Sequence, residues 1–373
     1  MPPTEDTSTP EAERPALDLE AVEKQSKLVY RNVVGGMVTL LAVIGDRLDL
    51  FKTLAAEGPL AADEFAEHAH IHPRYAEEWL GGMASAGYIT YDAATARFLL
   101  TPTQAAVIAD EGGPYFLGGP IEMAAALGGV LDLVVQTFRE GGGVPQSAYD
   151  PRLFEGMERG GAGWTDHVLV ESVLPLLPEV EVALRRGAHV ADIGCGGGRL
   201  LIRLARAFPA SRFAGYDLFA PNVERATANA SAAGLADRVS FHALDASAGL
   251  PGTFDVIFTS DVVHDAAQPV TLLRAIRAAL TPEGVYVCIE PATEETLEQR
   301  AGLRGAFLYG ASILYCMTTS LAQGGVGLGA HGLPESRMRA LCHEAGFSRV
   351  RHVPTPDAFG KVDTVESVFE IRP

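Results

Sequence analysis

The feature that most constrains the fold is an apolar segment that breaks into a glycine cluster at residues 189–198. The sequence there reads His-Val-Ala-Asp-Ile-Gly-Cys-Gly-Gly-Gly, and a helix is expected over residues 200–208. A strand, a glycine turn and a helix in this order are typical of doubly wound α/β domains that bind nucleotide-like ligands. Glycine has no Cβ, so backbone N–H groups and the N-terminus of the helix can approach the ligand closely.

The register of the glycines distinguishes two kinds of site. A dinucleotide fingerprint of the form G-x-G-x-x-G needs its third glycine at position 199, where the chain has Arg199. The spacing that is present, acid-x-Gly-x-Gly-x-Gly, resembles motif I of the class I S-adenosylmethionine-dependent methyltransferases. The resemblance implies S-adenosylmethionine as cofactor and S-adenosylhomocysteine as product. It places the methionine end of the cofactor beside a loop formed by Asp192, Gly194, Cys195, Gly196 and Gly198.

Two further predicted strands end in acids. The strand over residues 212–218 contains Asp217, and the strand over residues 239–245 ends in Asp245. The carboxyl ends of parallel strands form the ligand-binding edge of an open α/β sheet, so these acids are expected to lie near the glycine loop. We expect Asp217 to bind the ribose, and the resemblance implies that Asp245 accepts from the adenine amino group; either could instead cap the next helix. The predicted cofactor site is completed by Leu218, Ala246, Ser260 and Asp261.

The strand over residues 254–261 leads into His264-Asp265. This pair resembles the His-Asp pair of small-molecule O-methyltransferases, which implies that His264 removes a proton from the acceptor oxygen. Imidazole suits this task because its ordinary pKa lies near neutrality, although His264 could also be purely structural. Asp265 would orient the ring or cap the helix over residues 269–280, and Glu290, after the strand over residues 284–289, would hold the imidazolium. The family has Trp after this pair where the chain has Ala266, which leaves the acceptor class open.

Two other chemistries remain open. Glu171, on a helix expected over residues 164–177, could be a buried base for methylation at carbon or nitrogen, although such a residue is more often a surface or salt-bridged glutamate. A chain of this fold could also bind S-adenosylmethionine and use it for a cyclisation or rearrangement without transferring the methyl group.

Residues 20–110 are predicted to form a separate winged helix, with helices over 61–68 and 73–85 followed by short strands at 87–90 and 97–100. Small-molecule O-methyltransferases carry a similar N-terminal dimerisation domain, which implies a homodimer. A DNA-binding regulator is the alternative. It is disfavoured because the helix that would enter a groove opens with one Arg and two Glu, and because the chain has a net charge of −18. Nucleic acid is therefore not an expected partner.

The fold expected overall is α/β, with a Rossmann-like seven-stranded methyltransferase sheet and a smaller, mainly α winged-helix domain. The methyltransferase domain would span residues 166–373 and end in strands over 349–355 and 366–372. An apolar, glycine-containing insertion at 291–333 is predicted to form a lid, and a helical connector at 111–165 to close the pocket from the other side. These segments favour a small, mostly apolar acceptor, aromatic or natural-product-like. Residues 1–19 are predicted to be a disordered tail.

Metal and membrane sites are not expected. His68, His70 and His72 alternate, but they straddle a helix end and a turn, which disfavours a metal site. The apolar stretch 120–138 contains Glu122 and Asp132, which argues against a membrane span. The four cysteines show no C-x-x-C spacing, so we expect reduced thiols and a cytoplasmic protein.

Overall fold

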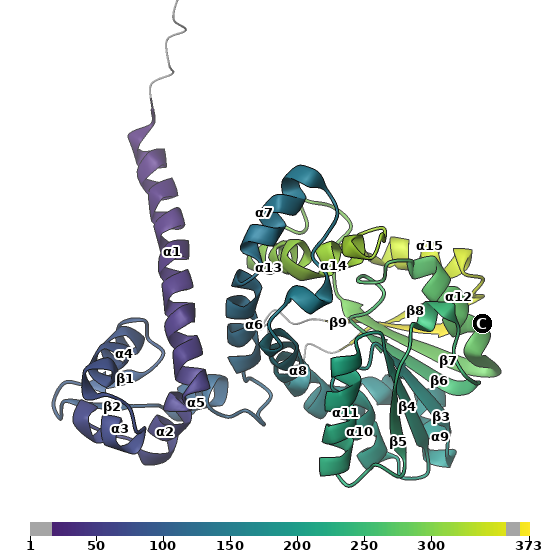
Figure 1. Cartoon of the computed structure of the whole chain (residues 1–373), viewed down its shortest axis with the longest axis horizontal. Coiled ribbons are helices and arrows are strands. Elements are labelled where there is room, and N and C mark those ends of the chain that lie inside the picture. Colours follow the sequence, from purple (N-terminus) through teal and green to yellow (C-terminus); the bar gives the residue numbers. More distant parts are fainter. Residues whose placement is uncertain (1–16, 356–365) are drawn as a thin grey trace, which may run out of the picture.

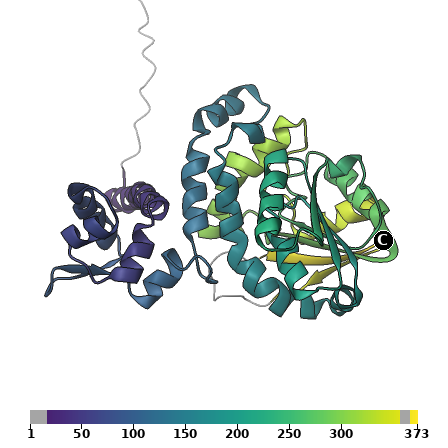
Figure 2. The same cartoon turned by 60° about the horizontal axis from the view of Figure 1, so that its bottom comes forward.

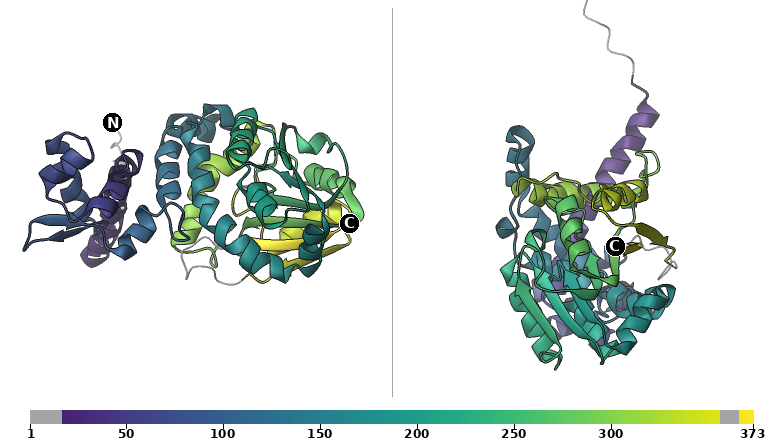
Figure 3. Two further views of the ribbon diagram at one scale, coloured as in Figure 1. Left: turned by 90° about the horizontal axis from the view of Figure 1, so that it is seen from below. Right: turned by 90° about the vertical axis from the view of Figure 1, so that its right-hand side faces the viewer.

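The computed structural model describes residues 17–355 and 366–373. A helical N-terminal unit lies beside a larger domain built on a β-sheet, as Figure 1, Figure 2 and the left panel of Figure 3 show. Residues 1–16 of the predicted disordered tail lie outside the described residues. Helix α1 begins at Leu19, where the Asp18 side chain accepts from the backbone N–H groups of Glu20 and Ala21 and so caps the helix.

The N-terminal unit has the predicted winged-helix order of helices followed by an antiparallel hairpin. Its hairpin starts later than expected, because Gly87 adopts a φ of +80° and its N–H bonds back to the carbonyl of Ala84, which ends the preceding helix. The unit consists of α1 (Leu19–Arg47), α2 (Leu50–Glu57), α3 (Ala62–His68), α4 (Pro73–Ser85), β1 (Thr90–Asp92), β2 (Arg97–Leu99) and α5 (Pro102–Ile108).

In the described residues the large sheet has seven strands in the order β5-β4-β3-β6-β7-β9-β8, and β9 runs antiparallel to its neighbours. This confirms the predicted methyltransferase-type sheet with a terminal hairpin. The chain order changes direction between β3 and β6, and ligands of open α/β sheets bind at such a point. The strands are β3 (His189–Ile193), β4 (Arg212–Asp217), β5 (Val239–Ala243), β6 (Phe254–Ser260), β7 (Leu280–Pro291), β8 (Arg349–Val353) and β9 (Glu366–Arg372).

Helices cover both faces of this sheet. Successive strand residues point to opposite faces, so Val190 joins the core under α9 and α10, while Ala191 joins the core under α12 and α15. The helices that follow the N-terminal unit are α6 (Gly118–Gly128), α7 (Leu131–Glu140), α8 (Arg152–Trp164), α9 (Pro178–Arg186), α10 (Arg199–Ala207), α11 (Ala220–Ala232), α12 (Pro269–Ala279), α13 (Leu303–Ala311), α14 (Met317–Ala322) and α15 (Glu335–Glu344).

Three helical segments are irregular in the structure. The helix expected over residues 164–177 begins earlier, as α8, and continues through a π-helical turn, Thr165–Val173, and a 3-10 turn, Leu174–Leu176. The apolar stretch at residues 120–138 forms two helices, α6 and α7, and the chain bends by 58° between them at a break that contains Gly129. A second π-helical turn, Ser312–Cys316, joins α13 to α14. Such turns change the direction in which side chains point, and they are frequent at functional sites.

Two helical segments of the described chain are long and apolar enough to cross a membrane by length and composition, namely Leu19–Arg47 and Leu303–Ala322. The bent pair α6 and α7 would be a third if it counted as one span. The sequence argument about membranes considered residues 120–138 and missed these two segments. Leu303–Ala322 lines a cavity beside the sheet, whereas most of the apolar window of α1 is exposed.

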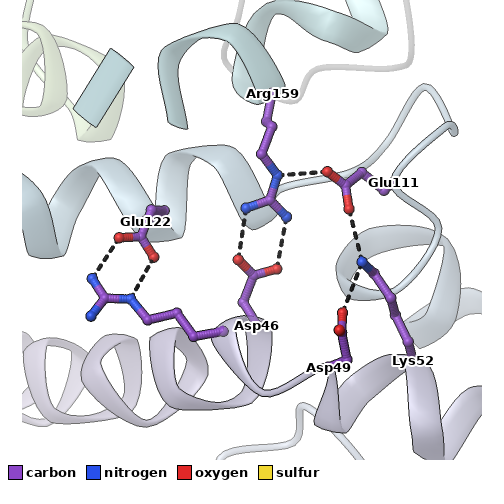
Figure 4. Close-up of polar contacts among 7 residues, drawn as sticks. Asp46, Asp49, Lys52, Glu111, Glu122 and Arg159 are labelled. Carbon is purple, nitrogen blue, oxygen red and sulfur yellow. Dashed lines mark hydrogen bonds and ion pairs between the residues drawn. The ribbon is translucent and has the colours of Figure 1, made fainter. Parts of the chain in front are cut away.

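A network of ion pairs joins the N-terminal unit to the helices beside the sheet (Figure 4). Asp46, at the end of α1, accepts two hydrogen bonds of 2.8 Å from Arg159 on α8. Arg159 also donates to Glu111 at 2.7 Å, and Glu111 in turn pairs with Lys52 of α2. The network is completed by Asp49, which pairs with Lys52, and by Arg47, which holds the buried Glu122 of α6.

We expect Arg159→Ala to lower the free energy of unfolding by about 2 kcal/mol, because it leaves the nearly buried Asp46 carboxylate without its partner. Arg74→Ala is the matched control. Arg74 pairs with Glu77 and Glu78 on the exposed face of α4, so its loss should cost less than about 0.5 kcal/mol. Urea unfolding measures both changes, and equal effects would show that the network does not stabilise the junction.

Candidate active site

A cavity of about 790 Å³ opens at the carboxyl ends of β3, β4, β5 and β6. Cavities that bind small ligands usually measure 300 to 1,000 Å³, so this one is large enough for an extended ligand or for two smaller ones. Its floor comes from the loops after these strands, and its opposite walls come from α6, α8, α13 and the π-helical turn before α14. Predicted cofactor and catalytic residues therefore meet the connector and the insertion at one cavity.

The glycine loop after β3 forms one wall of this cavity, through Gly194, Cys195, Gly196 and Gly197. Gly198, predicted to contact the cofactor, has another role. Its φ is +78°, and a Cβ there would come within 2.5 Å of the Phe241 ring, so the glycine allows α10 to begin close to β5. A Cβ on Gly197 would collide with the carboxylate of Glu158, which pairs with Arg225. Helix α8 is thereby held against the loop.

Asp217 holds the glycine loop in place. Its carboxylate accepts from the backbone N–H of Gly196 at 2.9 Å, from that of Phe219 at 2.8 Å and from the Asn222 side chain at 3.3 Å. Asp192 lies buried at the end of β3, on the same side of the cavity. Asn222 and Arg225, on α11, were not predicted from the sequence, because nothing in a helix pattern shows which of its residues face a loop.

The remaining predicted cofactor residues also line the cavity. Asp245 is exposed at its rim, where its side chain accepts from the Ser247 N–H at 2.9 Å, so it also caps a short turn as the alternative interpretation allowed. Asp261 follows β6 with a φ of +57°, which turns the chain sharply toward His264. The other three in the lining are Leu218, Ala246 and Ser260.

The electrostatics of this part of the cavity suit a cationic ligand. Burial and the neighbouring Asp217 carboxylate raise the pKa of Asp192 well above its ordinary value. Burial also raises the pKa of Asp217, although its backbone hydrogen bonds oppose this. A positive charge placed between the two carboxylates would favour their ionised forms. S-Adenosylmethionine carries a sulfonium and an ammonium group at its methionine end, so the residues present fit this cofactor.

His264 also lines this cavity and is 3% exposed. Its Nδ1 is 2.6 Å from Glu290 Oε2, and its Nε2 is 3.0 Å from Asp265 Oδ1. Burial lowers the pKa of His264, but the carboxylates of Asp265 and Glu290 outweigh it and raise that pKa well above its ordinary value. The sequence prediction that these three residues come together is therefore correct in its geometry.

Glu290 stands behind His264. It is fully buried at the end of β7, and its Oε1 accepts from the backbone N–H of Val263 at 2.8 Å and, at 3.3 Å, from that of Val262. One carboxylate thus fixes both the imidazole ring and the turn that carries it. The structure makes Glu290 a positioning residue, since the ring of His264 separates it from the cavity.

The wall facing His264 includes residues that sequence analysis did not select. Cys316 and Tyr315 lie on the π-helical turn, and the Tyr315 hydroxyl accepts from Gln146 at 2.8 Å. Glu366, at the start of β9, also lines the cavity, and burial together with Asp261 raises its pKa well above the ordinary value. Neither Cys316 nor Glu366 could be assigned to the site from the sequence, because Cys316 lies within an apolar helix pattern and Glu366 is a single glutamate at the edge of a strand.

Glu171 does not join this site. Its carboxylate forms an ion pair with Arg203 of α10, and its side chain is 53% exposed. The described lining of the cavity does not include it. The prediction that it could act as a buried base is therefore wrong, because the π-helical turn directs Glu171 toward the outer surface of α10.

Comparison with known families agrees with this geometry. The family model of the methyltransferase domain matches residues 184–317, which run from the end of α9 to the first residue of α14. Residues 184–317 form a methyltransferase domain. Domains of this kind use S-adenosylmethionine. The model of the Rv2258c-like winged HTH domain matches residues 36–110, so a winged-helix domain precedes the methyltransferase domain.

Curated relatives resemble the methyltransferase domain over part of their length. The chain is 34% identical over 102 residues to the ubiquinone biosynthesis O-methyltransferase of Cereibacter sphaeroides, which is 27% of this chain and 40% of that protein. It is 34% identical over 109 residues to the release factor glutamine methyltransferase of Bradyrhizobium diazoefficiens, or 29% of this chain and 36% of that protein. The chain thus matches about two fifths of the length of these relatives.

Solved structures share the whole architecture. The mitomycin 7-O-methyltransferase MmcR superposes with a TM-score of 0.68 at 21% identity, over 95% of this chain and 100% of that chain. Human N-acetylserotonin methyltransferase, solved in complex with S-adenosylmethionine, gives a TM-score of 0.65 at 18% identity, over 93% and 97% of the two chains. These likenesses show that the order of a helical N-terminal unit and a methyltransferase domain is a shared fold.

Proposed function

We propose that this chain transfers a methyl group from S-adenosylmethionine to an oxygen atom of a small, mostly apolar acceptor, with His264 as the general base. The observation that carries the proposal is that His264 opens to the same cavity as the glycine loop, while its Nδ1 is held by the buried Glu290. A proton-accepting group thus lies within the cavity that fits a cationic methyl donor.

The chemistry assigned to each residue follows from its contacts. S-Adenosylmethionine, when bound, supplies an electrophilic methyl group. Glu290 accepts the hydrogen of Nδ1, which leaves the Nε2 lone pair of His264 directed away from Glu290. His264 Nε2 takes the hydroxyl proton of the acceptor, because the acceptor oxygen is a better nucleophile as an anion. The two flanking carboxylates then stabilise the imidazolium that forms.

The acceptor walls favour an apolar molecule. Side chains of Met123, Phe154, Met157, Phe307 and Leu308 line the cavity. These residues come from the connector and from the insertion, which the sequence analysis expected to enclose the acceptor. Aromatic and natural-product-like hydroxyl compounds fit such walls, and the hydroxyl group to be methylated would face His264.

Asp265→Asn is expected to shift the pH dependence of methyl transfer. The base must be neutral to accept a proton, so kcat rises as pH passes the pKa of His264. The Asp265 carboxylate helps to raise that pKa, so its removal should move the rising limb to lower pH by about one unit. The exposed Asp132→Asn on α7 is the control. A limb that does not move would show that Asp265 has no influence on the base.

The test of the proposed function combines binding and turnover. Calorimetric titration with S-adenosylmethionine and S-adenosylhomocysteine should show one site in the wild type and much weaker binding in Asp217→Ala, since this change removes the anchor of the glycine loop. Screening phenolic and enolic compounds should then yield an O-methylated product. Binding without product formation on any hydroxyl acceptor would refute methyl transfer to oxygen, and absence of binding would refute the cofactor assignment.

We also propose that two copies of the chain associate through α1. The upper part of this helix projects away from the rest of its own chain in Figure 1. Along the helix, Val29, Val33, Met37 and Leu40 are all at least half exposed. These positions recur every three or four residues, so they form one apolar face that a second copy could cover.

Helix α4, by contrast, has its one basic residue, Arg74, paired with two glutamates, which supports the expectation that nucleic acid is not a partner.

Val33→Glu in the α1 face is expected to produce monomers, because a charge placed in an apolar interface must lose its hydration. Leu131→Glu, the same kind of change on the exposed surface of α7, is the control and should leave the dimer intact. Light scattering after size-exclusion chromatography measures the mass of each variant. A wild-type monomer, or a dimer that survives Val33→Glu, would contradict the proposed interface.

A further inference from the structure

Three side chains of different chemistry converge in the wall of the cavity, two from the turn after β6 and one from the π-helical turn before α14. Each of His264, Asp265 and Cys316 offers one donor atom, and these nitrogen, oxygen and sulfur atoms all lie within 4.8 Å of one another. All three residues also line the cavity, so a small ligand between the donor atoms would face the acceptor space.

The hydrogen bonds around the three residues leave the atoms that could bind a metal ion directed at one another. Nδ1 of His264 is occupied by Glu290 at 2.6 Å, so Nε2 is the nitrogen that faces Asp265 and Cys316. Metal-binding histidines commonly donate their second N–H to a carboxylate, which orients the ring. Asp265 Oδ1 is buried and makes no geometrically adequate hydrogen bond within the described part of the chain, although His264 Nε2 is only 3.0 Å away. This oxygen therefore has unused capacity as a ligand.

The donor set selects the kind of cation. A thiolate and an imidazole are preferred by zinc and similar ions, whereas magnesium and calcium prefer oxygen ligands. Zinc sites that are not purely structural typically have three protein ligands and one open position. Here the three donors would occupy one side of the ion, and the open position would face the cavity.

From this geometry we propose that His264, Asp265 and Cys316 form a binding site for one zinc-type divalent cation, which inhibits the enzyme by occupying the Nε2 atom of the general base. Binding replaces the proton of the Cys316 thiol, which is released to solvent, with a metal–sulfur bond. The ion also fills the space that the acceptor hydroxyl needs beside His264. The inhibition rests on the proposed function, whereas the binding site itself does not.

No sequence pattern indicates this site, because Cys316 is far from the His-Asp pair in the chain and reaches it through the π-helical turn. The histidines that alternate in the sequence are a different case. His68 ends α3, His70 lies in the turn with a φ of +53°, and His72 caps α4 by accepting from the Arg74 N–H at 3.2 Å. The alternating histidines therefore form a sequence pattern although their side chains are dispersed. The side chains of His264, Asp265 and Cys316 converge although no sequence pattern marks them.

Cobalt substitution tests the site directly, because a thiolate bound to Co²⁺ gives a charge-transfer band in the near ultraviolet. We expect chelator-treated wild-type protein to bind one equivalent of Co²⁺ with this band and to lose the band when Zn²⁺ is added. Cys316→Ser should lose the band and bind Zn²⁺ about tenfold or more weakly in competition with a chromophoric chelator. Cys342→Ser is the control, since Cys342 is buried against Met338 on α15 and should leave both readouts unchanged.

Other outcomes would overturn the proposal. A band that persists in Cys316→Ser, or one that disappears in Cys342→Ser, would place the ion elsewhere. Asp265→Asn provides a second variant in case Cys316→Ser is poorly folded, and unchanged zinc affinity in a folded Asp265→Asn protein would exclude that ligand. If the metal-free wild type methylates an acceptor but shows no cobalt band, the metal site fails and the proposed function stands. If the band appears but zinc does not slow turnover, the inhibition fails.

Discussion

His264→Gln is expected to lower kcat by a factor of roughly 10² to 10⁴ while leaving the affinity for S-adenosylmethionine unchanged. Glutamine retains hydrogen-bonding capacity but has no basic nitrogen, so the acceptor hydroxyl would keep its proton. The affinity should be preserved because the side chains that hold the glycine loop, Asp217 above all, are separate from the Glu290–His264 pair. Steady-state kinetics and calorimetry on the same preparation measure the two effects.

The matched control for this prediction is His343→Gln, which changes an exposed histidine on α15. It should have wild-type kcat. If His264→Gln loses cofactor affinity as strongly as it loses turnover, His264 supports the cofactor site instead of acting as a base. If it keeps wild-type kcat, the acceptor reaches its anionic form without this residue, and the proposed mechanism is wrong.

The sheet and its ligand-binding edge were predictable from the sequence because its strands are short apolar runs with a polar residue at or near the carboxyl end. Asp192 and Asp217 end β3 and β4, and parallel strands bring such ends to one edge whatever the helices between them contain. His264 follows β6 and Glu290 lies near the end of β7, and both were identified from the resemblance to small-molecule O-methyltransferases. Pairing between neighbouring strands then makes residues that are distant in sequence adjacent in space.

The acceptor side was less predictable because it is built by helices whose direction depends on tertiary packing. Glu171 and Cys316 both lie on π-helical turns, and a regular 3.6-residue pattern assigns the wrong face to such positions. Gly198 fitted the motif, but the structure uses it to pass close to Phe241. Glu366 reaches the cavity through the antiparallel pairing of β9 with β7, a register that no local signal at residue 366 specifies.

The ion-pair network at the domain junction is linked to the cofactor loop through two neighbouring residues of α8. Arg159 of α8 holds Asp46 and Glu111, whereas the preceding residue, Glu158, contacts Arg225 and Asn229 beside Gly197. Helix α8 therefore connects the N-terminal unit mechanically to the glycine loop.

Glu290→Gln is expected to lower kcat by a factor of about 10² to 10⁴ although Glu290 does not line the described cavity. The wild-type carboxylate accepts from His264 Nδ1, so Nε2 is the basic nitrogen. A glutamine amide group at that position would donate to Nδ1 and favour the tautomer that carries its hydrogen on Nε2, which cannot accept a proton. Glu298→Gln, a change in an exposed side chain of the insertion, is the control and should have no effect.

A double variant separates this tautomer effect from general damage to the fold. If Glu290 acts through His264, then His264→Gln combined with Glu290→Gln should be no slower than His264→Gln alone, because the second change has no base left to disturb. Multiplicative losses would instead show that Glu290 contributes independently of His264. Urea unfolding provides the remaining check: the Val263 N–H can still bond to the amide oxygen, so we expect a loss of stability of about 1 to 3 kcal/mol, too small to unfold the protein during the assay.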